Sequence, residues 1–145
     1  MYGIGLCYAS LGDKVKAYES YQHALTYYPK HRSVLNNLGT AFFEEKKYDS
    51  AYSYFKRSYD ADSSFPKSSQ NLAIYYFTVG DYNQAIQYAS NAVKLFKYQV
   101  IAYDVLSKAY KAVGNEAEAA KYQMLYVEMK AEADAAPEMN YIMER

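Results

Sequence analysis

The sequence predicts an all-α protein built from helix pairs that stack one upon the next, and two repeating patterns carry this prediction. Small residues recur every 34 positions along the 145-residue chain, at Gly5, Gly39, Ala73 and Ser107. An alanine follows each of them by twelve positions, at Ala17, Ala51, Ala85 and Ala119. A fixed period of this length is typical of repeat proteins, in which a repeat buries its apolar face only against its neighbours. We therefore expect about four stacked repeats, and a binding surface in preference to a catalytic pocket.

Within each period, apolar residues at helical spacing mark two helices with a break between them. In three periods the break is a glycine followed by Asp or Asn: Gly12-Asp13, Gly80-Asp81 and Gly114-Asn115. Glycine can close a helix in the left-handed conformation, and the next residue can cap the following helix. The second period has Lys46-Lys47 at this place, so we expect its turn to be strained.

The period divides the chain into four predicted repeats and a tail. Their boundaries are 1–31, 32–65, 66–99 and 100–134, with a tail or short capping helix at 135–145. Pro29 follows the first helix pair and Pro66 opens the third, both positions where proline is tolerated. The first repeat lacks the start of its opening helix, so we expect the chain to be part of a longer array.

Aromatic residues take part in the same period. One follows each small residue by three positions, at Tyr8, Phe42, Tyr76 and Tyr110, and we expect these rings to pack between helices. The chain has 20 tyrosines and no tryptophan. Half-buried tyrosines suit helix packing, and a tyrosine-lined recognition surface is the alternative.

The bulk composition excludes several classes of protein. Sixteen basic residues balance sixteen acidic ones, which disfavours a nucleic-acid or anionic-membrane surface. No apolar run approaches the ~20 residues of a membrane helix. One cysteine, Cys7, excludes an internal disulfide and is compatible with a reducing compartment. We expect a cytoplasmic location, with no nucleic-acid partner and no membrane insertion.

No pattern of residues indicates catalysis. His23 and His31 have no cysteine or carboxylate at metal-ligand spacing, and Cys7 falls at a position where later periods pack Ala41, Tyr75 and Ala109. Phosphate-binding loops, nucleophile motifs and zinc-helix motifs are absent from the sequence. The sequence therefore predicts a protein that is not an enzyme, with no cofactor and no metal site.

The order of the marked residues resembles the tetratricopeptide repeat family. The first period matches it at Gly5, Tyr8, Gly12, Ala17, Tyr21, Ala24 and Pro29. The third matches it at Leu72, Ala73, Tyr76, Gly80, Asp81, Tyr82, Ala85, Ile86 and Ala92. The second and fourth depart at Ser63 and Gln123, where the family prefers proline and an aromatic residue. The resemblance implies antiparallel helix pairs in a right-handed superhelical solenoid, whose first helices line a concave groove.

The resemblance also implies that exposed groove positions bind a peptide or a segment of a partner protein. The candidate residues are Asn37, Thr40, Phe43, Lys67, Asn71, Ile74, Phe77 and Lys108. Asn37 and Asn71 hold the same position in successive repeats, where a carboxamide can bond a peptide backbone or a neighbouring helix. The carboxylate clamp of chaperone-binding members is not expected, because Tyr2 and Leu6 stand where its lysine and asparagine would be.

Three interpretations remain open. The leading one is a non-catalytic scaffold that binds a protein or peptide. The second is self-assembly into a homo-oligomer through the unfinished first helix or the C-terminal segment. The third is an accessory segment of a larger protein. An RNA-binding helical repeat is disfavoured by the zero net charge.

Overall fold

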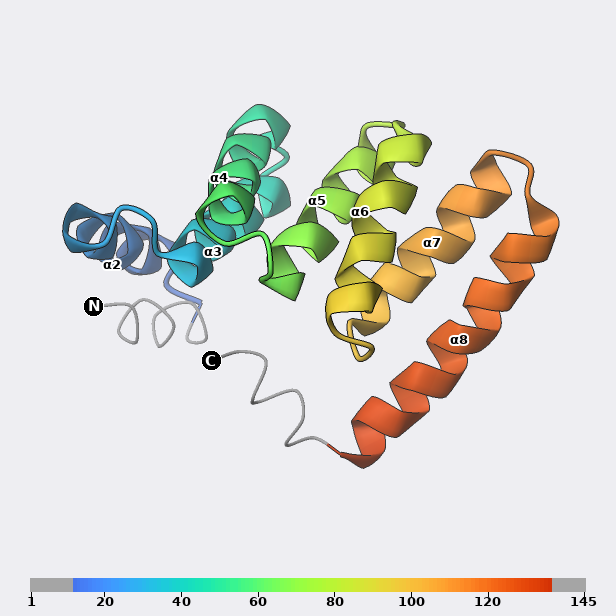
Figure 1. The fold of residues 1–145 in the computed structure, drawn as a ribbon. Helices are drawn as coiled ribbons and strands as arrows, with labels where there is room; N and C mark the ends of the chain where they lie inside the picture. Colours follow the sequence, from blue (N-terminus) through green and yellow to red (C-terminus); the bar gives the residue numbers. More distant parts are fainter. Residues whose placement is uncertain (1–11, 137–145) are drawn as a thin grey trace. The chain divides into compact units, whose positions relative to one another are not determined.

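The computed structural model describes residues 12–136, whose regular secondary structure is entirely helical. The chain divides into two compact units, Met1–Ser68 and Ser69–Arg145, and each is described by itself. The first contains α2 (Lys14–Tyr27), α3 (Arg32–Glu44) and α4 (Tyr48–Ala61), and the second contains α6 (Tyr82–Leu95), α7 (Val100–Ala112) and α8 (Glu116–Ala135). Between them in sequence, α5 (Pro66–Thr78) begins at Pro66, as predicted, and continues into the second unit (Figure 1). The all-α prediction is confirmed.

The turn inside each helix pair uses a left-handed residue at the predicted place. Gly12, Gly80 and Gly114 have φ of 79°, 87° and 84°. Lys46 occupies the equivalent position of the second period and has φ of 61°, the sole positive value for a non-glycine among the described residues. A side chain in this region meets steric strain that glycine avoids. The predicted strain at Lys46 is confirmed.

The residues after these glycines cap the next helices. Asp13 accepts a hydrogen bond from the backbone N–H of Lys16 at 3.1 Å, and Asp81 accepts one from Gln84 at 3.2 Å. The helix α8 begins in the same way, because Asn115 accepts from the backbone N–H of Glu118 at 3.2 Å. In contrast, Lys47 precedes α4 without a side-chain cap.

In the first unit, α3 packs against both α2 and α4. The principal hydrophobic core of the first unit consists of residues from α2 and α3: Ala17, Tyr21, Ala24, Leu25, Val34, Leu35 and Leu38. The packing of α3 against α4 depends on Gly39, because a Cβ added there would overlap the Phe55 ring of α4. The small residue of this period therefore makes room for a large neighbour.

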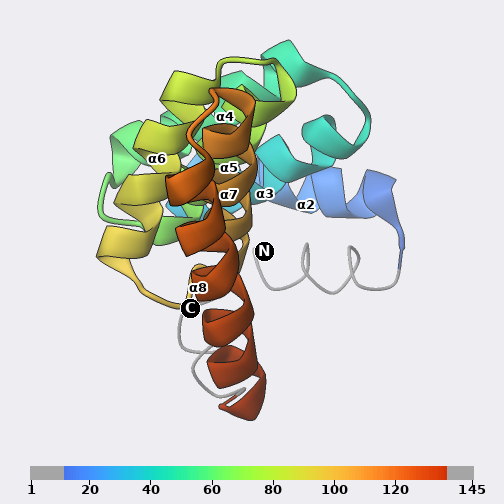
Figure 2. The ribbon, with the colours of Figure 1, turned by 90° about the vertical axis from the view of Figure 1, so that its right-hand side faces the viewer.

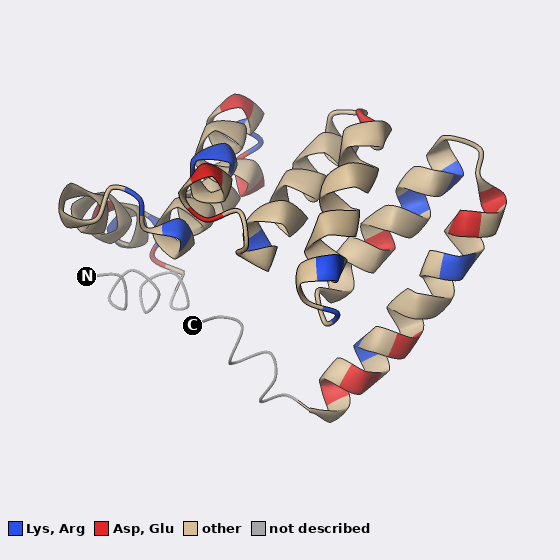
Figure 3. Ribbon diagram, viewed as in Figure 1, with Lys and Arg blue, Asp and Glu red and all other residues tan. Residues whose placement is uncertain are grey.

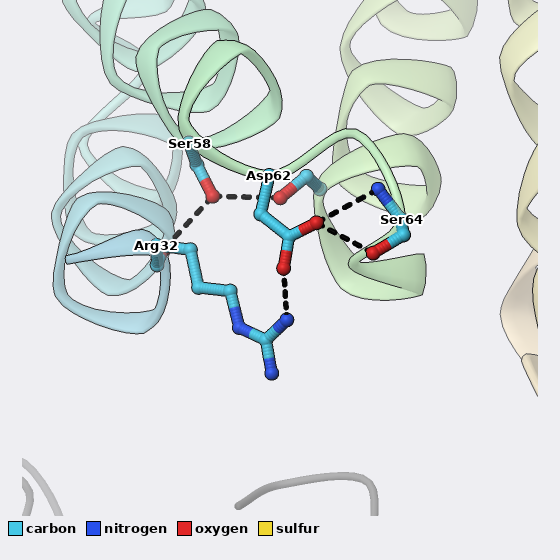
Figure 4. A network of polar contacts seen from close by, with 5 residues as sticks. Arg32, Ser58, Asp62 and Ser64 are labelled. Atoms are coloured by element: carbon cyan, nitrogen blue, oxygen red, sulfur yellow. Dashed lines mark hydrogen bonds and ion pairs between the residues drawn. The ribbon is translucent and has the colours of Figure 1, made fainter. Parts of the chain in front are cut away.

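A polar network joins the ends of α3 and α4 (Figure 4). Arg32 forms an ion pair with Asp62, and its guanidinium lies 4.3 Å from the centre of the Phe65 ring. Asp62 also accepts hydrogen bonds from Ser64, at 3.0 Å from the backbone N–H and 2.5 Å from the hydroxyl. The buried Ser58 hydroxyl donates to the carbonyl oxygen of Arg32 at 2.8 Å. These bonds satisfy the polar groups where one helix pair ends.

The core of the second unit is made largely of alanines. The fully buried alanines from α5, α6 and α7 are Ala73, Ala85, Ala89, Ala92, Ala102 and Ala109, and Leu106 is buried with them. Such short side chains let helix backbones approach closely. At the predicted contact between α7 and α8, the Ser107 hydroxyl donates to the carbonyl oxygen of Ala119 at 2.9 Å. The two small residues of the fourth period therefore lie in direct contact.

The periodic aromatic residues stack on tyrosines that lie twelve positions later. The ring pairs Phe42–Tyr54, Tyr76–Tyr88 and Tyr110–Tyr122 have centroid separations of 5.5, 5.5 and 5.6 Å and interplanar angles of 4°, 12° and 0°. All six rings are half-buried. The predicted packing role is confirmed for three of the four positions, and the fourth, Tyr8, lies outside the described residues.

The last helix, α8, is longer than the other helices and extends past the ends of α6 and α7 (Figure 2). It has 20 residues and ends at Ala135, two residues before Pro137. Its outward face carries apolar side chains, with Met124 73% and Val127 59% exposed. The predicted tail beyond Ala136 lies outside the described residues.

Candidate functional site

All eight predicted binding residues are at least partly accessible. Thr40 and Lys108 are exposed, and the remaining six are half-buried. Their neighbours Leu38, Leu72 and Leu106, in the same three helices, are fully buried. Each of α3, α5 and α7 therefore keeps an accessible face of mixed polar and apolar residues opposite its buried leucine.

In the first unit, Asn37 and Thr40 line one pocket of about 260 Å³ between α2 and α3. The Asn37 Nδ2 is buried without a hydrogen-bond partner among the described residues. Thr40 donates its hydroxyl to the carbonyl oxygen of Asn36 at 3.1 Å. At the rim, Lys14 Nζ lies 3.9 Å from Glu44 Oε2. Residues 1–11, predicted to contain the helix that pairs with α2, lie outside the described residues.

Phe43 is not among the residues that line this pocket, and it takes part in helix packing instead. Its ring contacts Tyr48 edge-on at 5.2 Å and lies 6.4 Å from the Phe55 ring, measured between centroids. Lys67, in the first turn of α5, is half-buried. The structure thus groups Asn37 with Thr40 and places Phe43 at the contact between α3 and α4.

In the second unit, Ile74 and Phe77 pack against the alanine-rich core while part of each stays accessible. The Phe77 ring lies 5.4 Å from the Tyr82 ring. Lys108 forms an ion pair with Asp104 at 2.8 Å, and this contact raises the pKa of Lys108 above its ordinary value. Asn71 is half-buried on the same helix as Ile74.

Charged residues are interspersed along the helices instead of gathering in one patch (Figure 3). On α8, two lysines lie among five acidic residues between Glu116 and Asp134. Within residues 12–136, no three His, Cys, Asp or Glu side chains are grouped so as to hold a metal ion. The same stretch contains no helix with the length and apolarity needed to cross a membrane.

A second pocket, in the second unit, was not singled out from the sequence. It has a volume of about 260 Å³ and includes Gln70 of α5 and Gln99, which precedes α7. Gln70 Oε1 and Gln99 Nε2 are both buried and have no hydrogen-bond partner within residues 12–136. No sequence pattern pairs Gln70 with Gln99, because they share a pocket only where α8 reaches the first turn of α7.

Comparisons with known proteins agree with this fold. The description "tetratricopeptide repeat" matches residues 2–65. A crystal structure of MamA is similar with a TM-score of 0.79 at 20% identity, covering 92% of this chain and 78% of that chain. The PilF protein of Pseudomonas aeruginosa is similar with a TM-score of 0.77 at 21% identity, covering 86% of this chain and 57% of that chain. The chain has the fold of tetratricopeptide-repeat proteins, as its residue pattern predicts.

The particular family is defined by a longer match. The family described as "domain of unknown function (DUF6340)" matches residues 37–131, and the chain belongs to this family. Tetratricopeptide repeats are in general non-catalytic scaffolds that bind protein partners.

Proposed function

We propose that the protein binds partner-protein segments through the accessible faces of α3 in the first unit and of α5 and α7 in the second, each unit by its own face. The observation that carries this proposal is the exposure pattern, in which all eight predicted residues stay accessible beside fully buried leucines. Carboxamide groups can bond a peptide backbone, and the partly exposed apolar side chains can hold its anchors.

The test begins with partner capture from cells that produce the protein, followed by titration calorimetry with the captured partner. We expect Asn71→Ala and Phe77→Leu each to weaken affinity about threefold to tenfold, since a hydrogen bond or an apolar contact contributes about 1 kcal/mol. Phe77→Leu keeps an apolar group in the core. The matched control is Gln87→Ala, at an exposed position of α6. Unchanged affinity in both Asn71→Ala and Phe77→Leu would contradict the proposal.

Self-assembly is the second candidate, and the outward face of α8 favours it. Five exposed apolar residues recur there at alternating steps of three and four: Ala117, Ala120, Met124, Val127 and Ala131. This spacing forms one stripe on a helix and is typical of helix–helix contacts. Sedimentation velocity over a concentration series separates the candidates, because a scaffold for another protein does not need to associate with itself.

A cytoplasmic location fits both candidates and stays a prediction. Fractionation of the producing cell, with detection of the untagged chain, tests it directly.

A further inference from the structure

The exposed apolar stripe of α8 is bordered by two charged residues of opposite sign. Glu116 and Lys130 lie along one edge of the stripe, fourteen residues apart, with Gln123 midway between them. Residues spaced by seven fall on nearly the same side of a helix, and all three side chains are exposed. The acid and the base are therefore about 21 Å apart along the helix axis, too far to pair with each other in one chain.

Glu116 and Lys130 are not used by the helix packing of the second unit. Within residues 12–136 no ion pair involves either of them, although Asp134 lies one turn from Lys130. In contrast, Lys121 on the other edge of the stripe lies 3.8 Å from Glu118 of its own chain. Any chain that covers the stripe must therefore place its own side chains against an unpaired acid at one end and an unpaired base at the other.

A second copy of α8 supplies the matching charges only in the antiparallel orientation. With a two-fold axis beside Met124, Glu116 of each chain lies opposite Lys130 of the other, so the pair forms at both ends. In the parallel orientation Glu116 would face Lys121, which is already paired, and Lys130 would face the uncharged Ala135. The dipoles of antiparallel helices also attract each other, whereas those of parallel helices repel. The charges along this edge therefore select one orientation.

We propose that the protein forms a symmetric dimer in which α8 lies antiparallel against α8 of a second copy, with the two stripes in contact and Glu116 paired to Lys130 at both ends. Ala120 then faces Val127 of the other chain, and the two Met124 side chains meet at the axis. Because one helix contacts one helix, the interface is small, and we expect a dissociation constant on the order of 10–100 µM. The proposal rests on the self-assembly candidate above, and the scaffold function does not depend on it.

Sedimentation velocity of charge-reversal variants tests this orientation. Glu116→Lys and Lys130→Glu each replace two attractions by two repulsions in the antiparallel dimer, so we expect each to raise the dissociation constant about tenfold. The double variant Glu116→Lys, Lys130→Glu exchanges the signs and should associate like the parent. A mixture of the two single variants should form heterodimers. The matched control is Lys94→Glu, a charge reversal at an exposed position of α6, which should leave association unchanged.

The outcomes separate the dimer from its orientation. A double variant as weak as Glu116→Lys alone would overturn the antiparallel orientation and leave self-assembly in place, because Lys130 faces no charge in a parallel dimer. A parent that stays monomeric up to about 500 µM, well above the expected dissociation constant, would overturn the dimer itself. The stripe would then serve another protein or residues 137–145, and the scaffold function would be unaffected. Circular dichroism verifies the fold of each variant, since Glu116 lies in the first turn of α8.

A distance measurement tests the orientation without changing either charge. Spin labels are attached to Gln123→Cys or to Ala135→Cys in a Cys7→Ser background, and pulsed electron paramagnetic resonance gives the distance between the two labels of a dimer. In the antiparallel dimer the labels at position 123 lie beside the axis, whereas those at position 135 are displaced by about 33 Å along it. In a parallel dimer both pairs of labels are equally close, and that result would overturn the proposal.

Discussion

Lys46 shows how much the turn between paired helices depends on a single backbone angle. It has φ of 61° at a position where three other periods place glycine. The neighbouring Lys47 provides no side-chain cap for α4, while its ammonium lies 2.9 Å from Glu45. This ion pair lowers the pKa of Glu45, but both side chains are well exposed, so it offsets little of the strain.

We expect Lys46→Gly to stabilise the protein by about 0.5–1 kcal/mol, because a left-handed side chain costs about 1–2 kcal/mol and glycine gives back part of that in unfolded-state entropy. Urea unfolding followed by circular dichroism measures the change. Lys46→Ala is the control: it removes the same side-chain charge and keeps the strain, so its stability should match that of the parent. An equal gain from alanine would show that charge, and not backbone strain, is the cause.

Gly39 shows a second single-residue constraint, the fit of a small residue to its neighbour. An added Cβ would overlap the Phe55 ring. The corresponding pair in the next period is Ala73 with Ala89, both fully buried. The second period thus pairs the smallest residue with a large ring, and the third period pairs two alanines.

We therefore expect Gly39→Ala to destabilise the protein by about 1–3 kcal/mol through overpacking. In a Phe55→Leu background the same substitution should cost clearly less, because the ring that it strikes is absent and contacting residues are not additive. Chemical denaturation of the parent, the two single variants and the double variant gives the coupling free energy between the two positions. A coupling near zero would mean that Phe55 is not the obstacle.

At the scale of the element, the ends of α3 and α4 are tied by Arg32 and Asp62. The hydrogen bond from the Ser64 hydroxyl is the largest cause of the lowered pKa of Asp62, and Arg32 adds to it against the opposing effect of burial. Because the pKa is lower in the folded chain, the stabilisation is present above the unfolded value of about 3.9. It is lost as the pH falls through the folded pKa.

We expect Asp62→Asn to lower the free energy of unfolding by about 0.5–1 kcal/mol at pH 7, the range for partly exposed ion pairs. The difference from the parent should shrink below about pH 4, where Asp62 itself becomes protonated. Thermal unfolding between pH 3 and pH 7 measures it. Asp60→Asn is the control, since the Asp60 side chain is 60% exposed and pairs only with Lys56 one turn away. A pH-independent difference for Asp62→Asn would contradict the assigned cause.

At the scale of the molecule, α8 carries exposed apolar residues that another chain could contact. The sequence gives this helix apolar residues on several sides. Its inner residues Ala119, Met129 and Ala133 are buried, while the stripe through Met124 and Val127 stays exposed. This stripe is the surface on which the proposal of self-assembly depends.

If self-assembly uses this stripe, the double variant Met124→Lys, Val127→Lys should remain monomeric at concentrations where the parent associates. Both positions are exposed, so the helix content and the thermal midpoint should change little. Sedimentation velocity measures association, and circular dichroism verifies the fold. Lys121→Ala, an exposed change beside the stripe, is the control. A parent that stays monomeric at all concentrations removes self-assembly as a function of this face.

Many local features could be predicted from the sequence because they depend on residues close together in the chain. The left-handed turns, the capping residues Asp13, Asp81 and Asn115, and the start of α5 at Pro66 all follow from the conformations that individual residues allow. The division into four repeats and the roles of the eight candidate residues stay predictions.

The 34-residue period thus determined by itself that the chain forms paired helices, because spacing and turn residues act within a few positions of each other. Only the tertiary structure decided which polar atoms lose contact with water. Gln70 and Gln99 are far from Lys130 and Ala133 in sequence, and they share a pocket because α8 passes beside the start of α7. Burial depends on side chains from distant segments, and no local pattern contains that information.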